Sequence, residues 1–152
     1  MTSAGQTQPD ETELNVSIAK EYFRRADAGR ADLLDLMTQD VQLYFPKFGV
    51  ARGRQAFGEV AAGLGGVFDW VEHDFSTYNF ISAARYVVVE GTTRGAMKDG
   101  KSWKAGETPG GRFCNVFEFE SGLISRVYVY LDPDYTSEDS GRFRWGREGR
   151  SW

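Results

Sequence analysis

The chain has 152 residues, enough for one domain with a buried core. Its net charge of −4 is spread over interspersed acids and bases, which argues against a nucleic-acid partner. No apolar run is long enough to span a bilayer, so no membrane partner is expected. A single cysteine, Cys114, excludes an internal disulfide, and a single histidine, His73, excludes a multi-histidine metal site. We expect neither a metal nor a cofactor.

The chain is expected to divide into three parts. Residues 1–12 are polar and acidic and are expected to form a disordered tail. They lack the basic start and apolar stretch of a signal peptide, which favours a cytoplasmic location. A folded domain is predicted over residues 13–133, and residues 134–152 are predicted to form a polar C-terminal tail that carries several aromatic side chains.

Hydrophobic periodicity predicts helices first and strands afterwards, which is typical of an α+β domain. The predicted helices cover residues 13–28, 31–37 and about 57–68, with a short strand over 41–45. The later predicted strands cover residues 71–81 and 86–97, a segment from 103, and residues 112–120 and 123–131. Asp10 or Thr12 can cap the first helix, and Gly29 suits a left-handed exit from it.

The later strands are apolar on both faces, one face purely aliphatic and the other mixed. The aliphatic face is predicted to hold Val87, Val89, Val116, Val127, Val129 and Leu131. A purely aliphatic face has to be covered, and we expect it to join two copies of the chain in a homodimer. The mixed face is then expected to line an internal cavity with the helices.

Three segments carry a family resemblance: AKEYFRRADAGRADLLDLMTQDVQLYFP, ARGRQAFGEVAAGL and FCNVFEFESGLISRVYVYLDP. They resemble the nuclear transport factor 2-like superfamily, and within it the SnoaL-like polyketide cyclase and ketosteroid isomerase-type branch. The resemblance implies a cystatin-like cone, with N-terminal helices packed on a curved, mainly antiparallel β-sheet. It also implies a hydrophobic pocket for a small hydrophobic or aromatic ligand.

The resemblance extends to individual positions only in part. Tyr22 matches the oxyanion-binding tyrosine of ketosteroid isomerases, and Asn115 stands at the position of their protonated aspartate. Phe45 stands where their general base would be. Asp132 matches an aspartate that limonene-epoxide hydrolases place at the end of the last strand. Their Arg-x-Asp pair has no counterpart here, because Glu90 and Thr92 occupy those positions.

Tyr22 and Asn115 are polar residues where the local pattern calls for apolar ones. A buried phenol or amide needs a partner, so the two are predicted either to hold a ligand oxygen or to bond to each other. Glu90 lies among valines, where desolvation would suit it to proton transfer, unless it pairs with Arg94. Asp132 fits either proton transfer or an Asp-Pro turn.

His73 is a third candidate for proton transfer, although the sequence does not show which way it points. The predicted catalytic set is therefore Glu90, Asp132, Tyr22, Asn115 and His73, with Glu90 as the principal base. The predicted substrate-binding residues are Phe45, Val88, Thr92, Phe113, Phe117, Tyr128 and Tyr130.

The favoured function is a cofactor-free enzyme that moves a proton on a hydrophobic, ring-containing carbonyl or hydroxy compound. Isomerisation, cyclisation, dehydration and lyase-type cleavage all belong to this class. One alternative is a non-catalytic ligand-binding or dimer-scaffold protein with the same cone. Another is a hydrolase of the epoxide-hydrolase type that uses Asp132.

Overall fold

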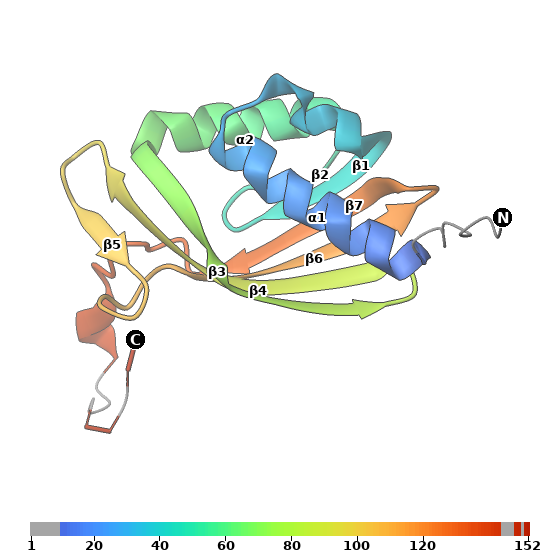
Figure 1. The fold of residues 1–152 in the computed structure, drawn as a ribbon. Coiled ribbons are helices and arrows are strands. Elements are labelled where there is room, and N and C mark those ends of the chain that lie inside the picture. Colours follow the sequence, from blue (N-terminus) through green and yellow to red (C-terminus); the bar gives the residue numbers. More distant parts are fainter. Residues whose placement is uncertain (1–9, 144–147, 150) are drawn as a thin grey trace, which may run out of the picture.

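The computed structural model describes residues 10–143, 148–149 and 151–152. Helices pack on a curved, open and mostly antiparallel β-sheet, and α1 (Glu11–Asp27) lies across its concave side (Figure 1). The predicted α+β class and the cystatin-like cone are confirmed. Most of the predicted N-terminal tail, residues 1–9, lies outside the described residues, whereas Glu11 and Thr12 already belong to α1.

The remaining elements follow the predicted order closely. They are η1 (a 3-10 helix, Ala31–Leu36), β1 (Met37–Phe45), β2 (Gly49–Arg52), α2 (Arg54–Val67), β3 (Phe68–Ala83), β4 (Tyr86–Met97), β5 (Ser102–Lys104), β6 (Arg112–Glu120), β7 (Leu123–Leu131) and η2 (a 3-10 helix, Ser140–Arg142). The sequence pattern does not reveal β2, because all four of its residues are exposed and carry no hydrophobic alternation.

Local chemistry sets both ends of α1. The Asp10 carboxylate accepts a hydrogen bond from the backbone N–H of Thr12 at 2.5 Å and so caps the first turn. Gly29 follows the helix with a φ of +61°, a left-handed conformation that glycine adopts without steric cost. The buried side of α1 presents Asn15, Ala19 and Phe23 to the sheet.

The strands run in the order β2-β1-β7-β6-β4-β3, and β5 adds to β4. β1 pairs with β7 in parallel, and the other pairings between these strands are antiparallel. Among the described strands β3 pairs only with β4, so it forms one edge of the sheet, and α1 packs against it. This arrangement brings the end of α1 close to the first half of β3.

The expectation about the two faces of the sheet is wrong. Val87, Val89, Val127 and Val129 are buried on the inner face, under the protein's own helices, together with Phe117. Leu131 lines the internal cavity, and Val116 belongs to the outer face. The aliphatic face packs against the helices of the same chain, which explains its apolar composition. It is therefore not free to join a second copy.

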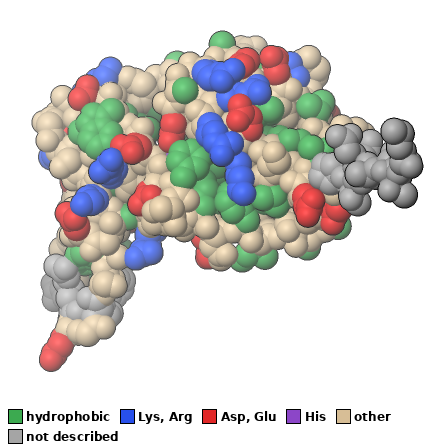
Figure 2. All heavy atoms as spheres, viewed as in Figure 1, with side chains coloured by type: hydrophobic (Ala, Val, Ile, Leu, Met, Phe, Trp, Pro, Cys, Tyr) green, Lys and Arg blue, Asp and Glu red, His purple; other side chains and the backbone are tan. Residues whose placement is uncertain are grey.

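The outer surface of the protein carries charges of both signs. On the side that carries α1, acidic and basic side chains are interspersed rather than gathered into a patch of one sign (Figure 2). None of the helices in the described part of the chain is both long and apolar enough to cross a membrane.

Candidate active site

A cavity of about 750 Å³ lies between the helices and the inner face of the sheet. Apolar side chains dominate its wall, among them Leu33 of η1, Leu64 of α2, Phe45 of β1 and Val129 of β7. A concave, mostly apolar pocket with a few polar groups is the usual form of a small-molecule site. The polar groups on the wall therefore decide what the cavity can do.

His73 and Asp27 form a pair on this wall. The imidazole Nδ1 of His73 lies 2.5 Å from Oδ1 of Asp27, and the backbone N–H of His73 donates to Oδ2 at 3.2 Å. Asp27 comes from the last turn of α1, and His73 comes from β3, where it pairs with the inward-facing Thr93. The side chains are 21% and 19% exposed, so the pair is largely screened from water but open to the cavity.

This geometry fixes the orientation of the imidazole. A carboxylate accepts hydrogen bonds, so in the neutral imidazole the proton belongs on Nδ1, which points to Asp27, and the lone pair belongs on Nε2. Phe23 and Phe113 pack against the ring, each at 5.2 Å between centroids. A histidine held by a carboxylate on one nitrogen, with the other nitrogen unprotonated, is the arrangement of a general base.

Asn115 contributes a buried side-chain amide to the same wall. Its side chain is only 4% exposed, and its Oδ1 has no hydrogen-bond partner among the described residues. A buried amide oxygen without a partner costs free energy, which a hydrogen-bond donor on a ligand would offset. The placement of Asn115 in the cavity agrees with the sequence prediction, and its role there stays a prediction.

Tyr22 lies on α1 and also lines the cavity. Its ring packs edge-on against Phe23 and Phe117, at 5.2 and 5.1 Å between centroids. Burial raises the pKa of its phenol well above the usual value, so the hydroxyl stays protonated and can donate a hydrogen bond. Among the described residues no hydrogen bond joins Tyr22 to Asn115, so the alternative that the two bond to each other is wrong.

Glu90 does not lie in the cavity. It is exposed on the outer side of β4, where its Oε2 accepts a hydrogen bond from Nδ2 of Asn79 at 3.0 Å. The alternative pairing with Arg94 is also wrong, because Arg94 pairs with Glu72. The expectation is wrong because the inner face of β4 is the purely aliphatic one, which carries Val87 and Val89.

Asp132 also lies outside the cavity. It is exposed after β7, and its carboxylate accepts a hydrogen bond from the backbone N–H of Asp134 at 2.9 Å. This is the turn geometry that an Asp-Pro sequence favours, and it leaves Asp132 without access to the cavity wall.

The predicted substrate-binding residues divide between the two faces. Phe45 and Phe113 line the cavity, and Phe117 is fully buried behind Tyr22. The other four face outward, and their assignment to the cavity is wrong: Val88, Thr92, Tyr128 and Tyr130.

Asp27 was missed at the sequence level, although the sequence carried a signal. Carboxylates are unfavourable in the last turn of a helix, where the helix dipole is negative, and basic residues are preferred there. Asp27 therefore needs a compensating partner, and His73 provides it. Asp27, an acidic residue near the C-terminal end of a cavity-facing helix, could therefore have been paired with the single histidine.

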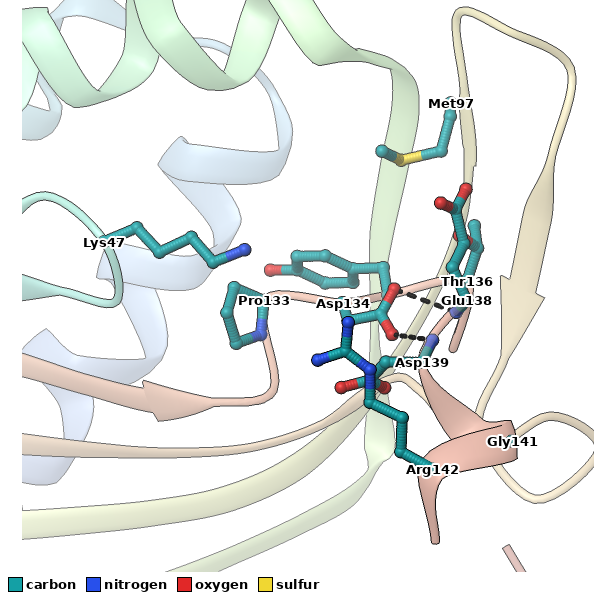
Figure 3. Close-up of a pocket in the computed structure, with 10 residues that line it drawn as sticks. Lys47, Met97, Pro133, Asp134, Thr136, Glu138, Asp139, Gly141 and Arg142 are labelled. Atoms are coloured by element: carbon teal, nitrogen blue, oxygen red, sulfur yellow. Dashed lines mark hydrogen bonds between the residues drawn. The ribbon is translucent and has the colours of Figure 1, made fainter.

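A second cavity of about 620 Å³ lies beside the C-terminal segment (Figure 3). The carboxylate of Asp134 accepts backbone hydrogen bonds there from Glu138 and Asp139, both at 3.1 Å, and these bonds lower its pKa. Tyr135 lines both cavities and is buried. Asp134 is therefore engaged in shaping the chain before η2.

The comparisons place this site in a known family. A model of the SnoaL-like domain matches residues 19–127, so the chain belongs to the SnoaL-like family. No curated protein matches the chain significantly.

Solved structures share the fold at low sequence identity. A putative polyketide cyclase from Xanthomonas campestris pv. campestris has a TM-score of 0.71 and 15% identity, over 81% of this chain and 93% of that one. An NTF2-like protein from Anabaena variabilis has a TM-score of 0.69 and 20% identity, over 87% and 98%. TerC, co-crystallised with polyporic acid, has a TM-score of 0.67 and 18% identity, over 78% and 92%. At such identities the likeness establishes the fold, and function depends on the site.

Proposed function

We propose that the protein is a cofactor-free enzyme that removes a proton from carbon in a neutral, hydrophobic, ring-containing carbonyl compound. The observation that carries this proposal is the Asp27–His73 pair on the wall of a largely apolar cavity. The family relationship supports it, since some structural neighbours are described as putative polyketide cyclases. The proposal replaces Glu90 and Asp132, which lie outside the cavity, with His73 as the base.

The polar groups on the cavity wall can take part in both steps of this reaction, removal of the proton and stabilisation of the negative charge that results. Nε2 of His73 takes the proton from the carbon beside the carbonyl, and Asp27 stabilises the imidazolium that forms. Negative charge then develops on the carbonyl oxygen, where the amide of Asn115 and the hydroxyl of Tyr22 donate hydrogen bonds. Return of the proton at another carbon gives isomerisation. Attack of the enolate carbon on a second carbonyl carbon of the same molecule, whose oxygen then takes the proton from His73, gives cyclisation, and loss of a leaving group from the neighbouring carbon gives elimination. The apolar wall keeps water from the intermediate.

Proton abstraction can be tested before the product is known. Neutral ring-containing ketones are incubated with the protein in D₂O, and replacement of the carbon-bound proton by deuterium is followed by NMR. The wild-type protein should accelerate exchange in at least one compound. His73→Gln should lower that rate about 10²–10⁴-fold, the usual contribution of a general base. Asp27→Asn should lower it substantially as well, because the imidazole loses its orienting carboxylate.

Glu90→Gln is the matched control, since it removes a carboxylate from the outer side of the same sheet. Its exchange rate should stay within about twofold of wild type, because surface groups rarely affect a remote reaction. Normal exchange in His73→Gln would contradict the proposed base. Tight binding of the ring compounds with no exchange in any of them would favour the non-catalytic ligand-binding alternative.

We also propose that two copies associate through the outer face of the sheet, instead of through the aliphatic face. Tyr44 contacts Tyr128 and Tyr130 there, at 5.6 and 5.5 Å between ring centroids, and Tyr130 is 48% exposed. Clustered tyrosines are typical of protein interfaces, because their rings are apolar and their hydroxyls tolerate water. The oligomeric state of the protein in solution tests this proposal.

A further inference from the structure

Four glycines interrupt α2, the helix that forms one side of the cavity. They are Gly58, Gly63, Gly65 and Gly66, in a helix of 14 residues that lies on the same side of the sheet as α1 (Figure 1). After proline, glycine is the residue least favourable to a helix, because its backbone loses the most freedom on folding. Each of these positions therefore calls for a reason in the structure.

Packing accounts for one of the four glycines. A Cβ atom at Gly63 would lie 2.8 Å from Cζ of Phe48, so a side chain there would collide with the turn between β1 and β2. At Gly58, Gly65 and Gly66 a Cβ atom would meet no described atom within 4 Å beyond the adjacent backbone of the helix, and none of the three has a left-handed φ. A side chain could therefore be added at these three positions without a clash or backbone strain.

Gly58 and Gly65 both border the cavity. They line its wall and are exposed to solvent, so they lie where the cavity opens, which we call its mouth. Ala61, about one turn from each of them along α2, lines the cavity and is exposed as well. Gly66 is also exposed but lies outside the cavity wall. One strip of α2 thus presents almost no side-chain volume to the mouth.

Small residues from a second part of the chain also lie at the mouth. Gly29, which follows α1, and Ala31 of η1 line the cavity and are exposed. The buried end of the cavity is different, since Asn115 is 4% exposed and its Oδ1 has no partner among the described residues. The cavity therefore has a buried end with a polar group for a ligand and an open end with small residues on both segments.

The volume of the cavity indicates a ligand of more than one ring. An apolar cavity of about 150 Å³ is enough to hold benzene. This cavity has a volume of about 750 Å³. A one-ring ketone would therefore leave most of the space unfilled and would make few of the contacts with the wall on which the affinity of an apolar ligand depends.

We propose that Gly58 and Gly65 are specificity-determining residues, which keep the mouth of the cavity wide enough for a neutral ketone with several fused rings. The carbonyl end of such a compound lies at the buried end of the cavity with Asn115 and His73, and its outer ring lies at the mouth. The inference deepens the proposed function and rests on the cavity assigned there to the ketone. A larger side chain at either glycine would occupy the space of the outer ring and leave the space of the first ring free.

The test compares the binding of cyclohexanone, which has one ring, and anthrone, which has three, to leucine variants. Leucine favours a helix more than glycine does and meets no clash at either position, so Gly58→Leu and Gly65→Leu should fold at least as well as wild type. The dissociation constants are measured by tryptophan fluorescence, since Trp70 lines the cavity. Each variant should bind anthrone about tenfold more weakly than wild type does, and cyclohexanone within about twofold of wild type.

Gly66→Leu is the matched control, because it makes the same change in the same helix but outside the cavity wall. It should bind both ketones as wild type does. A loss of anthrone binding in Gly66→Leu would overturn the inference, because the glycines would then act through the flexibility of α2. Equal losses of both ketones in Gly58→Leu and Gly65→Leu, no loss of either, or a wild-type protein that does not bind anthrone would overturn it too.

The outcome can be separated from that of the proposed reaction, because binding is measured without turnover. If Gly58→Leu and Gly65→Leu lose anthrone selectively but the wild-type protein exchanges no ketone proton for deuterium, the specificity stands and the proposed reaction falls. If His73→Gln abolishes exchange while both leucine variants bind anthrone normally, the proposed reaction stands and the role of the two glycines falls.

Discussion

Asn115 and Glu90 show that a polar residue has different surroundings on the two faces of one sheet. They lie on paired strands, where Asn115 is opposite Val89 and Glu90 is opposite Cys114. Asn115 faces inward with an unpartnered Oδ1, whereas Glu90 faces outward and is bonded to Asn79. A step of one residue along a strand reverses the face. Asn115 therefore keeps a hydrogen-bond acceptor for a ligand, whereas the carboxylate of Glu90 is already bonded.

The largest stability difference between the faces should appear in a pair of isoleucines. Ile124 is fully buried on the inner face of β7, and Ile81 is 53% exposed on β3. Ile124→Ala should lower the free energy of unfolding by about 2–5 kcal/mol because it leaves a cavity in the core. Ile81→Ala should change it by about 0.5 kcal/mol or less. Urea unfolding measures both, and equal losses would refute the assignment of the faces.

Association in solution should depend on the outer face. The wild-type protein should be a dimer at micromolar concentration by light scattering, and Tyr128→Asp should be a monomer. A charge buried in an apolar interface without a partner is strongly unfavourable. Phe48→Asp is the control, since Phe48 is 52% exposed in the turn between β1 and β2 and lies against Gly63 of α2. A monomeric wild-type protein, or a dimeric Tyr128→Asp with native circular dichroism, would contradict this interface.

A smaller effect should appear in alkaline solution. Burial raises the pKa of Tyr22, so above about pH 10 the unfolded chain releases a proton that the folded chain retains. Stability is then fully present below that pH and falls as the pH rises, by at most about 1.4 kcal/mol per unit for one group. Tyr22→Phe should reduce this slope between pH 10 and pH 11 in urea unfolding. Tyr130→Phe, on the hydrated outer face, should leave the slope as it is.

The smallest effect should concern Cys114, the only cysteine. Burial, and secondarily the charge of Glu90 on the neighbouring strand, raise the pKa of its thiol. Glu90→Gln removes that charge, so more thiolate should be present at pH 8 and the reaction with a disulfide reagent should be faster, by about twofold. Glu120→Gln, at the end of β6, should react at the wild-type rate. An unchanged reaction rate in Glu90→Gln would show that the charge of Glu90 does not affect the Cys114 thiol.

Most of the fold could be predicted because its signals are local. Spaced apolar residues marked the helices, Asp10 and Gly29 marked the ends of α1, and tight-turn residues separated β4 from β5. The two faces of the strands could not be assigned in the same way. Both faces carry apolar residues, and only the packing of the helices decides which one is buried.

The candidate site was predictable where a residue broke its local pattern. Tyr22 and Asn115 interrupt apolar faces, and both line the cavity. Asp27 and His73 interrupt no apolar face, and the unfavourable place of Asp27 at the end of α1 does not name a partner 46 residues away. Their contact depends on how α1 crosses the sheet toward its edge strand, which is a property of the tertiary structure.

The contact between Asp27 and His73 also links a helix to the edge of the sheet. β3 is hydrogen-bonded to a neighbour on one side only, whereas β6, which carries Asn115, is flanked by β4 and β7. Edge elements open at lower free energy than central ones in hydrogen-exchange experiments. Partial opening of this edge would therefore separate the imidazole from its carboxylate while the centre of the sheet remained folded. Mild denaturant should abolish proton transfer before it abolishes ligand binding.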